Sequence, residues 1–111
     1  MEAIKLLLSV ANEFSDTPGP RSRVEGDFSG ELFLEELLLP RYAQAVAQKA
    51  TLTVDLDGTE GYATSFLEAA FGGLARGYDP EQVLRTINFK SEDEPYLIEE
   101  IKKYVSEARR K

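Results

Sequence analysis

The stretch Thr51–Gly73, TLTVDLDGTEGYATSFLEAAFGG, places the tightest limit on the fold of this chain. It opens with a β-branched run, Thr51–Leu56, that is typical of a buried strand. Asp57-Gly58 then supplies turn chemistry, and apolar residues recur at helical spacing in the predicted helix Phe66–Ala75. Because a strand that turns directly into a helix is half of a β-α-β unit, this stretch predicts a parallel sheet covered by helices.

The remaining segments extend the same alternation of strands and helices. The predicted strands and loops are a first strand at Ile4–Val10, a long loop at Asn12–Gly30 that could hold a short hairpin at Ser22–Asp27, and a third strand at Thr86–Lys90. The predicted helices are one from Gly30, a second segment Arg41–Gln48 after Pro40, a short one from Asp79-Pro80 through Leu84, and a last one to about Arg109. The fold class is therefore α/β, a small, mainly parallel sheet with helices packed on it, in one domain spanning 1–111.

Finer features of the helices also follow from the sequence. Hydroxyl and carboxylate side chains predict the N-caps: Ser29 for the helix from Gly30, Ser65 or Thr64 for the middle helix, and Ser91 or Asp93 for the last. Apolar spacing directs Ala43, Ala45 and Val46 toward the core. Gly72-Gly73 inside a helix is costly and indicates close packing against a neighbour.

Composition excludes several kinds of chemistry. The chain has no histidine and no cysteine, so triads and zinc sites built on these residues are ruled out. The net charge of −7 repels phosphate backbones, so we expect no nucleic-acid partner. The apolar run Ile4–Val10 is too short to cross a membrane, and we expect a cytoplasmic protein.

Asp55-Leu56-Asp57-Gly58-Thr59 resembles the first motif of haloacid-dehalogenase-type phosphatases. In that chemistry the first aspartate attacks phosphorus, the second shuttles a proton, and magnesium neutralises the phosphate. Residues that could complete such a site are few: Thr86, Lys90, Glu92 and Asp93. A magnesium-dependent phosphatase is therefore the alternative function, and an ordinary Asp-Gly turn is the simpler interpretation of the motif.

The strand-turn-helix unit also resembles the core of STAS domains, the sulfate-transporter and anti-sigma-antagonist fold, in which a strand ends in Asp-Leu and a hydroxyl pair opens an apolar helix. Further segments, the Pro-Gly-Pro-Arg loop, FSGELF, DLDGTEGY, SFLEAAFGGL and FKSEDEPYLIEEI, are similar to a bacterial STAS-like family of undefined function. The resemblance runs over essentially the whole chain.

This resemblance implies a regulatory, non-catalytic role. In STAS antagonists the helix-opening serine is phosphorylated by a GHKL-type ATPase/kinase partner, and some STAS domains bind a nucleotide near the same helix start. Carried over by position, the phosphorylation candidates are Ser65 and then Thr64. The usual Asp-Ser-Ser-Gly opening is replaced here by Ala63-Thr64-Ser65-Phe66, so an N-cap role for Ser65 remains open beside the switch.

Parallel sheets gather ligand-binding loops beyond the C-terminal ends of their strands, which directs attention to five residues in those loops: Arg21, Arg23, Asp57, Glu60 and Tyr62. Arg21 could grip a phosphate or pair internally with Asp57 or Asp55. We expect a solvated acidic turn at Asp57 and Glu60, with no metal and no cofactor. Asp55, in the strand, needs a donor such as Arg21 or a backbone N–H of the turn.

The sequence therefore predicts a non-enzymatic protein-interaction module. Besides the phosphatase, a dimer-forming interaction domain without a switch remains an alternative.

Overall fold

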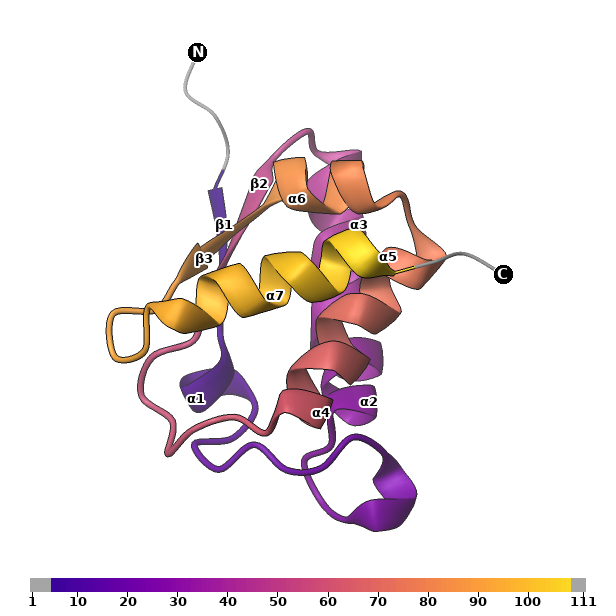
Figure 1. The fold of residues 1–111 in the computed structure, drawn as a ribbon. Coiled ribbons are helices and arrows are strands. Elements are labelled where there is room, and N and C mark those ends of the chain that lie inside the picture. Colours follow the sequence, from indigo (N-terminus) through magenta and orange to yellow (C-terminus); the bar gives the residue numbers. More distant parts are fainter. Residues whose placement is uncertain (1–4, 109–111) are drawn as a thin grey trace.

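Three parallel strands form the sheet of this protein, in a computed structural model that describes residues 5–108. The sheet order is β1-β2-β3, and both neighbouring pairs are parallel (Figure 1). The strands are β1 (Lys5–Ser9), β2 (Thr51–Asp55) and β3 (Ile87–Lys90). The α/β prediction is confirmed; Ile4, predicted in the first strand, lies outside the described residues.

One face of the sheet carries the core. Leu8 pairs with Val54, which pairs in turn with Phe89, and the side chains of Leu8 and Val54 are fully buried. Because successive side chains alternate between faces, the neighbouring row points the other way, and Leu7 in that row is 59% exposed. The helices therefore bury only one side of this sheet.

Two long helices, at residues 30–47 and 64–77, dominate the rest of the molecule, and each contains a π turn. The first consists of α2 (Gly30–Phe33), the π turn η2 (Leu34–Leu38) and α3 (Leu39–Ala47). The second consists of α4 (Thr64–Leu67), the π turn η3 (Glu68–Gly72) and α5 (Gly73–Gly77). The other helical segments are α1 (Val10–Glu13), a 3-10 turn η1 (Arg23–Glu25), α6 (Pro80–Thr86) and α7 (Tyr96–Glu107).

The predicted interruption at Pro40 is wrong, because the helix at 30–47 runs through the proline. The π turn η2 ends two residues before Pro40, and the N–H of Leu39 reaches back to the carbonyl of Leu34. A proline lacks the N–H needed for a regular helical bond and crowds the preceding turn. The widened turn relieves this conflict without ending the helix.

Close backbone contact joins the two long helices. A Cβ on Gly30 would lie 2.5 Å from the carbonyl oxygen of Phe66, and one on Gly73 would lie 2.8 Å from Cδ2 of Leu34. Both separations are too short for a real side chain. The close packing that Gly72-Gly73 predicts is confirmed at Gly73.

Large aromatic side chains fill the core between these helices and the sheet. The rings of Phe33 and Phe66 are 5.8 Å apart, and those of Phe33 and Phe71 are 6.3 Å apart. Tyr42 is also fully buried. From helix α3 the core receives Tyr42 and Ala45, whereas Ala43 and Val46 are exposed, which corrects two of the three inward residues predicted there.

The free edge of β1 is closed by side chains. Arg41 donates from Nη1 to the carbonyl of Leu7 at 3.1 Å, and the N–H of Ser9 donates to Glu13 at 2.9 Å. Arg41 and Glu13 also form an ion pair with each other. Exposed edge strands invite pairing with other chains, and Arg41 and Glu13 occupy two of the backbone groups that such pairing could use.

Several local predictions are wrong in detail. Ser22–Asp27 holds the 3-10 turn η1 instead of a hairpin. Helix α7 begins at Tyr96 after Pro95, with no side-chain cap, and Ser91 instead donates from its hydroxyl to the carbonyl of Glu94 at 2.7 Å. The short helix α6 begins at Pro80 as predicted but continues to Thr86.

Among the described residues, no helix has both the length and the apolar character needed to cross a membrane.

Candidate functional site

The loops that follow the three strands are joined to one another at one end of the sheet. The N–H of Glu60 donates to the carbonyl of Asp16 at 2.8 Å, which ties the loop after β2 to the loop after α1. Asp57 accepts the N–H of Asp93 at 2.9 Å, and Asp93 in turn accepts the N–H of Gly58 at 3.1 Å. These bonds confirm that the three loops meet beyond the strand ends.

Asp57 is the centre of this junction. Its second carboxylate oxygen is 3.1 Å from Nζ of Lys90. Partial burial alone would raise the pKa of Asp57, but the N–H groups of Asp93 and Glu92 and the Lys90 ammonium outweigh it and hold the pKa below its usual value. The same lysine has a raised pKa, chiefly through hydrogen bonds to Glu92 and Asp57. At neutral pH, Asp57 is therefore ionised and engaged on both oxygens.

Asp55 lies beside this junction, at the end of β2. Its side chain is 22% exposed and lies 3.9 Å from Nζ of Lys90. It accepts the N–H of Asp57 at 3.0 Å. The turn backbone, rather than Arg21, thus supplies the donor that this half-buried carboxylate was predicted to need.

The aromatic residues near the strand ends differ in exposure. Tyr62 is half-buried, donates to the carbonyl of Leu56 at 2.8 Å, and has a pKa raised mainly by burial. Phe28 is 44% exposed, has a left-handed backbone (φ 53°), and stacks edge-on against Phe14 at 5.6 Å. Tyr62 therefore braces the loop, whereas the side chain of Phe28 faces solvent.

The helix at 64–77 begins without a side-chain cap. Its N-cap residue is Ala63, so Thr64 and Ser65 occupy its first two positions. The capping predictions for Ser65 and Thr64 are therefore wrong. By contrast, Ser29 caps helix α2 as predicted, by accepting the N–H of Leu32 at 3.0 Å. The Thr64 side chain is exposed and Ser65 is half-buried, so both hydroxyls lie at or near the surface.

We call the surface formed by Asp57, Glu60, Tyr62, Thr64 and Ser65 the strand-end rim. This rim directly follows β2 and includes five of the seven candidate site residues that were predicted from the sequence. The other two, Arg21 and Arg23, are not part of it.

Arg21 forms an internal ion pair, but with a different partner from the predicted ones. Its Nη1 is 2.5 Å from Glu68 in the π turn η3, and Arg76 binds the other oxygen of Glu68 at 2.7 Å. The predicted pairing with Asp55 or Asp57 is wrong, because the loop carries Arg21 to the side of the helix at 64–77. Arg23 pairs with Glu35 at 2.8 Å.

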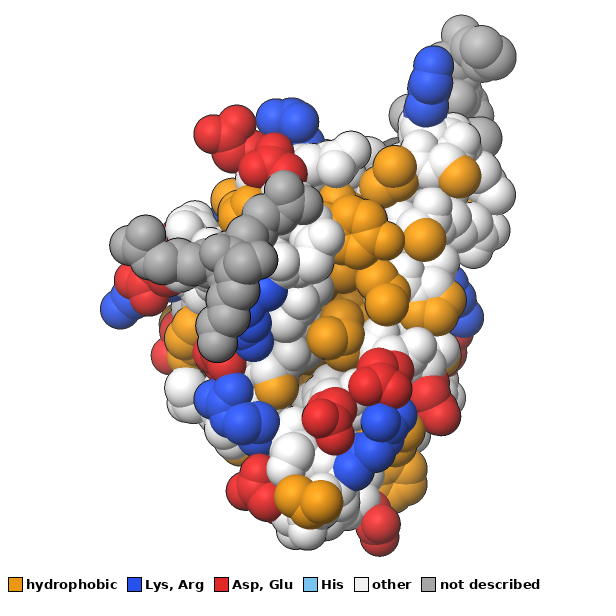
Figure 2. Space-filling view, turned by 90° about the vertical axis from the view of Figure 1, so that its right-hand side faces the viewer, with side chains coloured by type: hydrophobic (Ala, Val, Ile, Leu, Met, Phe, Trp, Pro, Cys, Tyr) orange, Lys and Arg blue, Asp and Glu red, His pale blue; other side chains and the backbone are white. Residues whose placement is uncertain are grey.

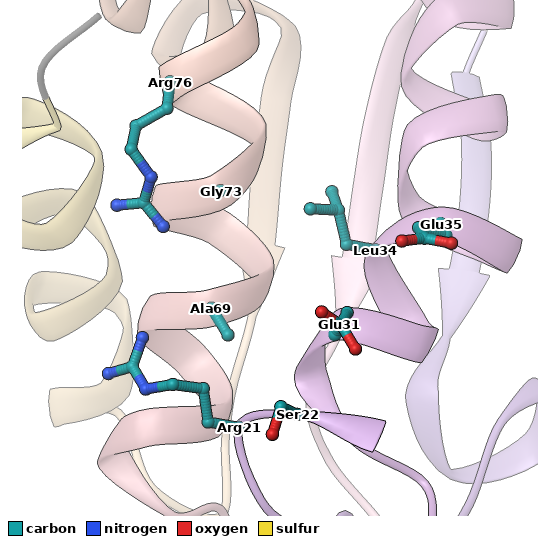
Figure 3. A pocket seen from close by; sticks show the side chains of 8 residues that line it. All are labelled: Arg21, Ser22, Glu31, Leu34, Glu35, Ala69, Gly73 and Arg76. Atoms are coloured by element: carbon teal, nitrogen blue, oxygen red, sulfur yellow. The ribbon is translucent and has the colours of Figure 1, made fainter. Parts of the chain in front are cut away.

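These ion pairs border a pocket of about 360 Å³ between the two long helices, which we call the interhelical pocket (Figure 3). Arg21 and Arg76 lie on one side of it, and Glu31 and Glu35 on the other. Figure 2 shows the face of the molecule that lies on the right in Figure 1. On this face, acidic and basic side chains are interleaved below a band of apolar side chains. Sequence reasoning missed Glu68 and Arg76; the only signal nearby was the unusual Gly72-Gly73 between them.

Within residues 5–108, no group of three or more acidic side chains is arranged to hold a metal ion.

Comparison with known proteins identifies a family. The model of a family described as a STAS-like domain of unknown function (DUF4325) matches residues 29–97, which is more than half of the chain. The matched segment runs from the N-cap of α2 to the first turn of α7 and so includes the strand-end rim. No curated protein and no solved structure matches.

Proposed function

The chain belongs to the family of STAS-like domains of unknown function, and on this premise we propose that it is a non-catalytic regulatory module that binds a protein partner at the strand-end rim. The open start of the helix at 64–77 is the observation that carries this proposal. The N–H groups of Thr64 and Ser65 have no hydrogen-bond partner among the described residues. Free N–H groups at a helix start favour an anion.

Phosphorylation of one of these hydroxyls would act on that helix start. A phosphate adds a charge of about −1.5 to −2 and would meet the free N–H groups and the positive end of the helix dipole. Glu68, bound to Arg21, follows Ser65 by three residues, and residues three apart share a helix face. A phosphate on Ser65 would therefore compete with Glu68 for Arg21 and change both the charge and the shape of the rim.

The resemblance to STAS antagonists supplies the kind of partner. We propose a GHKL-type ATPase/kinase that contacts the unphosphorylated rim and modifies Thr64 or Ser65. A nucleotide bound by that partner could lie near the same helix start. Thr64 is the more exposed hydroxyl, so it is at least as good a substrate as Ser65.

Capture from lysate of the native host tests the proposal. The wild-type protein is immobilised beside three variants, Thr64→Asp, Ser65→Asp and the control Ser106→Asp, whose serine is exposed on α7. We expect wild type and Ser106→Asp to retain a common partner that at least one rim variant loses. Equal capture by all four proteins would contradict the phosphoswitch, and intact mass of protein from the native host shows directly whether a phosphate is present.

A second candidate function follows from the position of Lys90. Its ammonium lies 3.1 Å from Asp57 and 3.9 Å from Asp55, which gives the two aspartates of the phosphatase-like motif a shared cation. Incubation with an aryl phosphate and magnesium tests this alternative. Turnover that requires the metal and disappears in Asp55→Asn would establish a phosphatase and displace the binding role.

A further inference from the structure

The two walls of the interhelical pocket carry opposite net charge. On one wall, Arg21 and Arg76 share the single carboxylate of Glu68, which leaves one positive charge uncompensated. On the other, Arg23 pairs with Glu35, while Glu31 accepts only the backbone N–H of Arg23, at 3.1 Å. That wall retains one negative charge.

Hydrogen-bonding capacity remains on both walls. A guanidinium has five N–H donors, and among the described residues Arg21 and Arg76 each use Nη1 on Glu68. The backbone N–H of Arg23 engages only Oε1 of Glu31, so the second carboxylate oxygen of Glu31 is available to a ligand. The side chains of Arg21 and Arg76 are 48% and 39% exposed, so a ligand can reach them without unfolding the loop.

The floor between the walls is apolar. It consists of Leu34, Ala69 and Gly73, and Leu34 points toward Gly73 across the gap (Figure 3). A Cβ on Gly73 would lie 2.8 Å from Leu34. Glycine at this position therefore lets Leu34 pack directly against the backbone of the helix at 64–77. Both π turns border this floor, and such turns are frequent at functional sites.

We propose that the interhelical pocket binds a small linear zwitterion, with its anionic end on Arg21 and Arg76, its cationic end on Glu31, and an apolar chain over the floor. The two charges must be separated by the apolar chain, because Arg76 in α5 and Glu31 in α2 stand on different helices, on opposite sides of the floor (Figure 3). This site lies outside the strand-end rim and does not rest on the function proposed there, although the ion pair of Arg21 with Glu68 borders both.

NMR titration with 6-aminohexanoate tests the site, with the amide signals of Leu34, Ala69 and Gly73 as reporters. Hexanoate and hexylammonium are the matched probes that carry only one of the two charges. We expect saturable shifts with a Kd of roughly 10 mM or tighter for the zwitterion, and binding about tenfold weaker for either single-charge probe.

Variants assign the two ends. Arg76→Gln and Glu31→Gln should each weaken binding of 6-aminohexanoate about tenfold, and Arg76→Gln should leave hexylammonium unaffected. The control Arg85→Gln removes a cation from α6, where Arg85 faces Glu81 at 3.9 Å, and should change nothing. Chemical-shift dispersion of each variant establishes that it is folded.

Three results would overturn the proposal. Hexanoate binding as tightly as 6-aminohexanoate would mean that the acidic wall contributes nothing. An Arg85→Gln effect equal to that of Arg76→Gln would mean nonspecific electrostatics. The absence of saturable shifts with all three probes would mean that the pocket takes no ligand of this class.

Discussion

Single side chains decide how the loops of this protein are held, and Asp57 is the clearest example. It accepts the N–H of Asp93 and contacts Lys90, so one carboxylate joins the turn after β2 to the end of β3. The sequence marked Asp57 as a solvated turn residue, because Asp-Gly is common in turns. Its bond to Asp93 could not be predicted, since it depends on how closely β2 and β3 bring their loops together.

Asp57→Asn should make the free energy of unfolding depend less on pH in the acid range. The folded-state pKa of Asp57 is lowered, so its contribution is present at neutral pH and is lost as pH falls through and below the ordinary aspartate range, about 4. We expect the variant to lose about 1 kcal/mol at pH 7 and to converge on wild type toward pH 3. Urea unfolding across this pH range measures the effect.

Asp16→Asn is the control for this prediction, since Asp16 accepts the N–H of Glu60 with its backbone carbonyl. It should unfold like wild type at every pH. A constant deficit of Asp57→Asn from pH 7 to pH 3 would show that the carboxylate charge is not what stabilises the junction.

Ser29 and Ser65 look alike in the sequence, but their effects on stability should differ. Ser29→Ala removes the acceptor for the N–H of Leu32 in a buried position and should cost about 1 kcal/mol. Ser65→Ala removes no cap, because Ala63 holds the N-cap position, and should cost no more than a few tenths. Chemical denaturation of both variants tests this, and equal losses would restore a capping role for Ser65.

The existence of each strand and most helices followed from periodicity, because period-2 and helical patterns report burial directly. The continuity of the helix at 30–47 did not follow, since Pro40 normally ends a helix. The π turn that accommodates the proline lies where this helix packs against the other long helix, and that packing is a tertiary effect. The local sequence therefore predicts the two helical segments within 30–47, but not that they form one continuous helix.

Gly30→Ala should loosen the contact between the two long helices. Its new Cβ would lie 2.5 Å from the backbone oxygen of Phe66, and a backbone atom cannot move aside cheaply. We expect a loss of about 1–3 kcal/mol in the free energy of unfolding, measured by urea denaturation. Gly77→Ala, whose Cβ meets no heavy atom within 4 Å, is the control, and a comparable loss there would contradict the packing argument.

For the molecule as a whole, the topology predicted the position of the strand-end rim, because parallel strands bring their following loops to one edge. It did not predict the destination of Arg21. Acidic partners are plentiful in a chain with net charge −7, and the choice of Glu68 over Asp55 or Asp57 depends on the path of the loop at 14–29. The interhelical pocket was missed for the same reason.

Site-specific photo-crosslinking in the native host tests the central claim, that the strand-end rim is the binding surface, most directly. A photoreactive residue at Glu60 reports from the rim, and one at Ser106 on α7 reports from outside it; both positions are exposed. The rim position should yield a discrete protein adduct that the α7 position does not. An adduct formed only at Ser106, or equally at both positions, would contradict the binding role assigned to the rim.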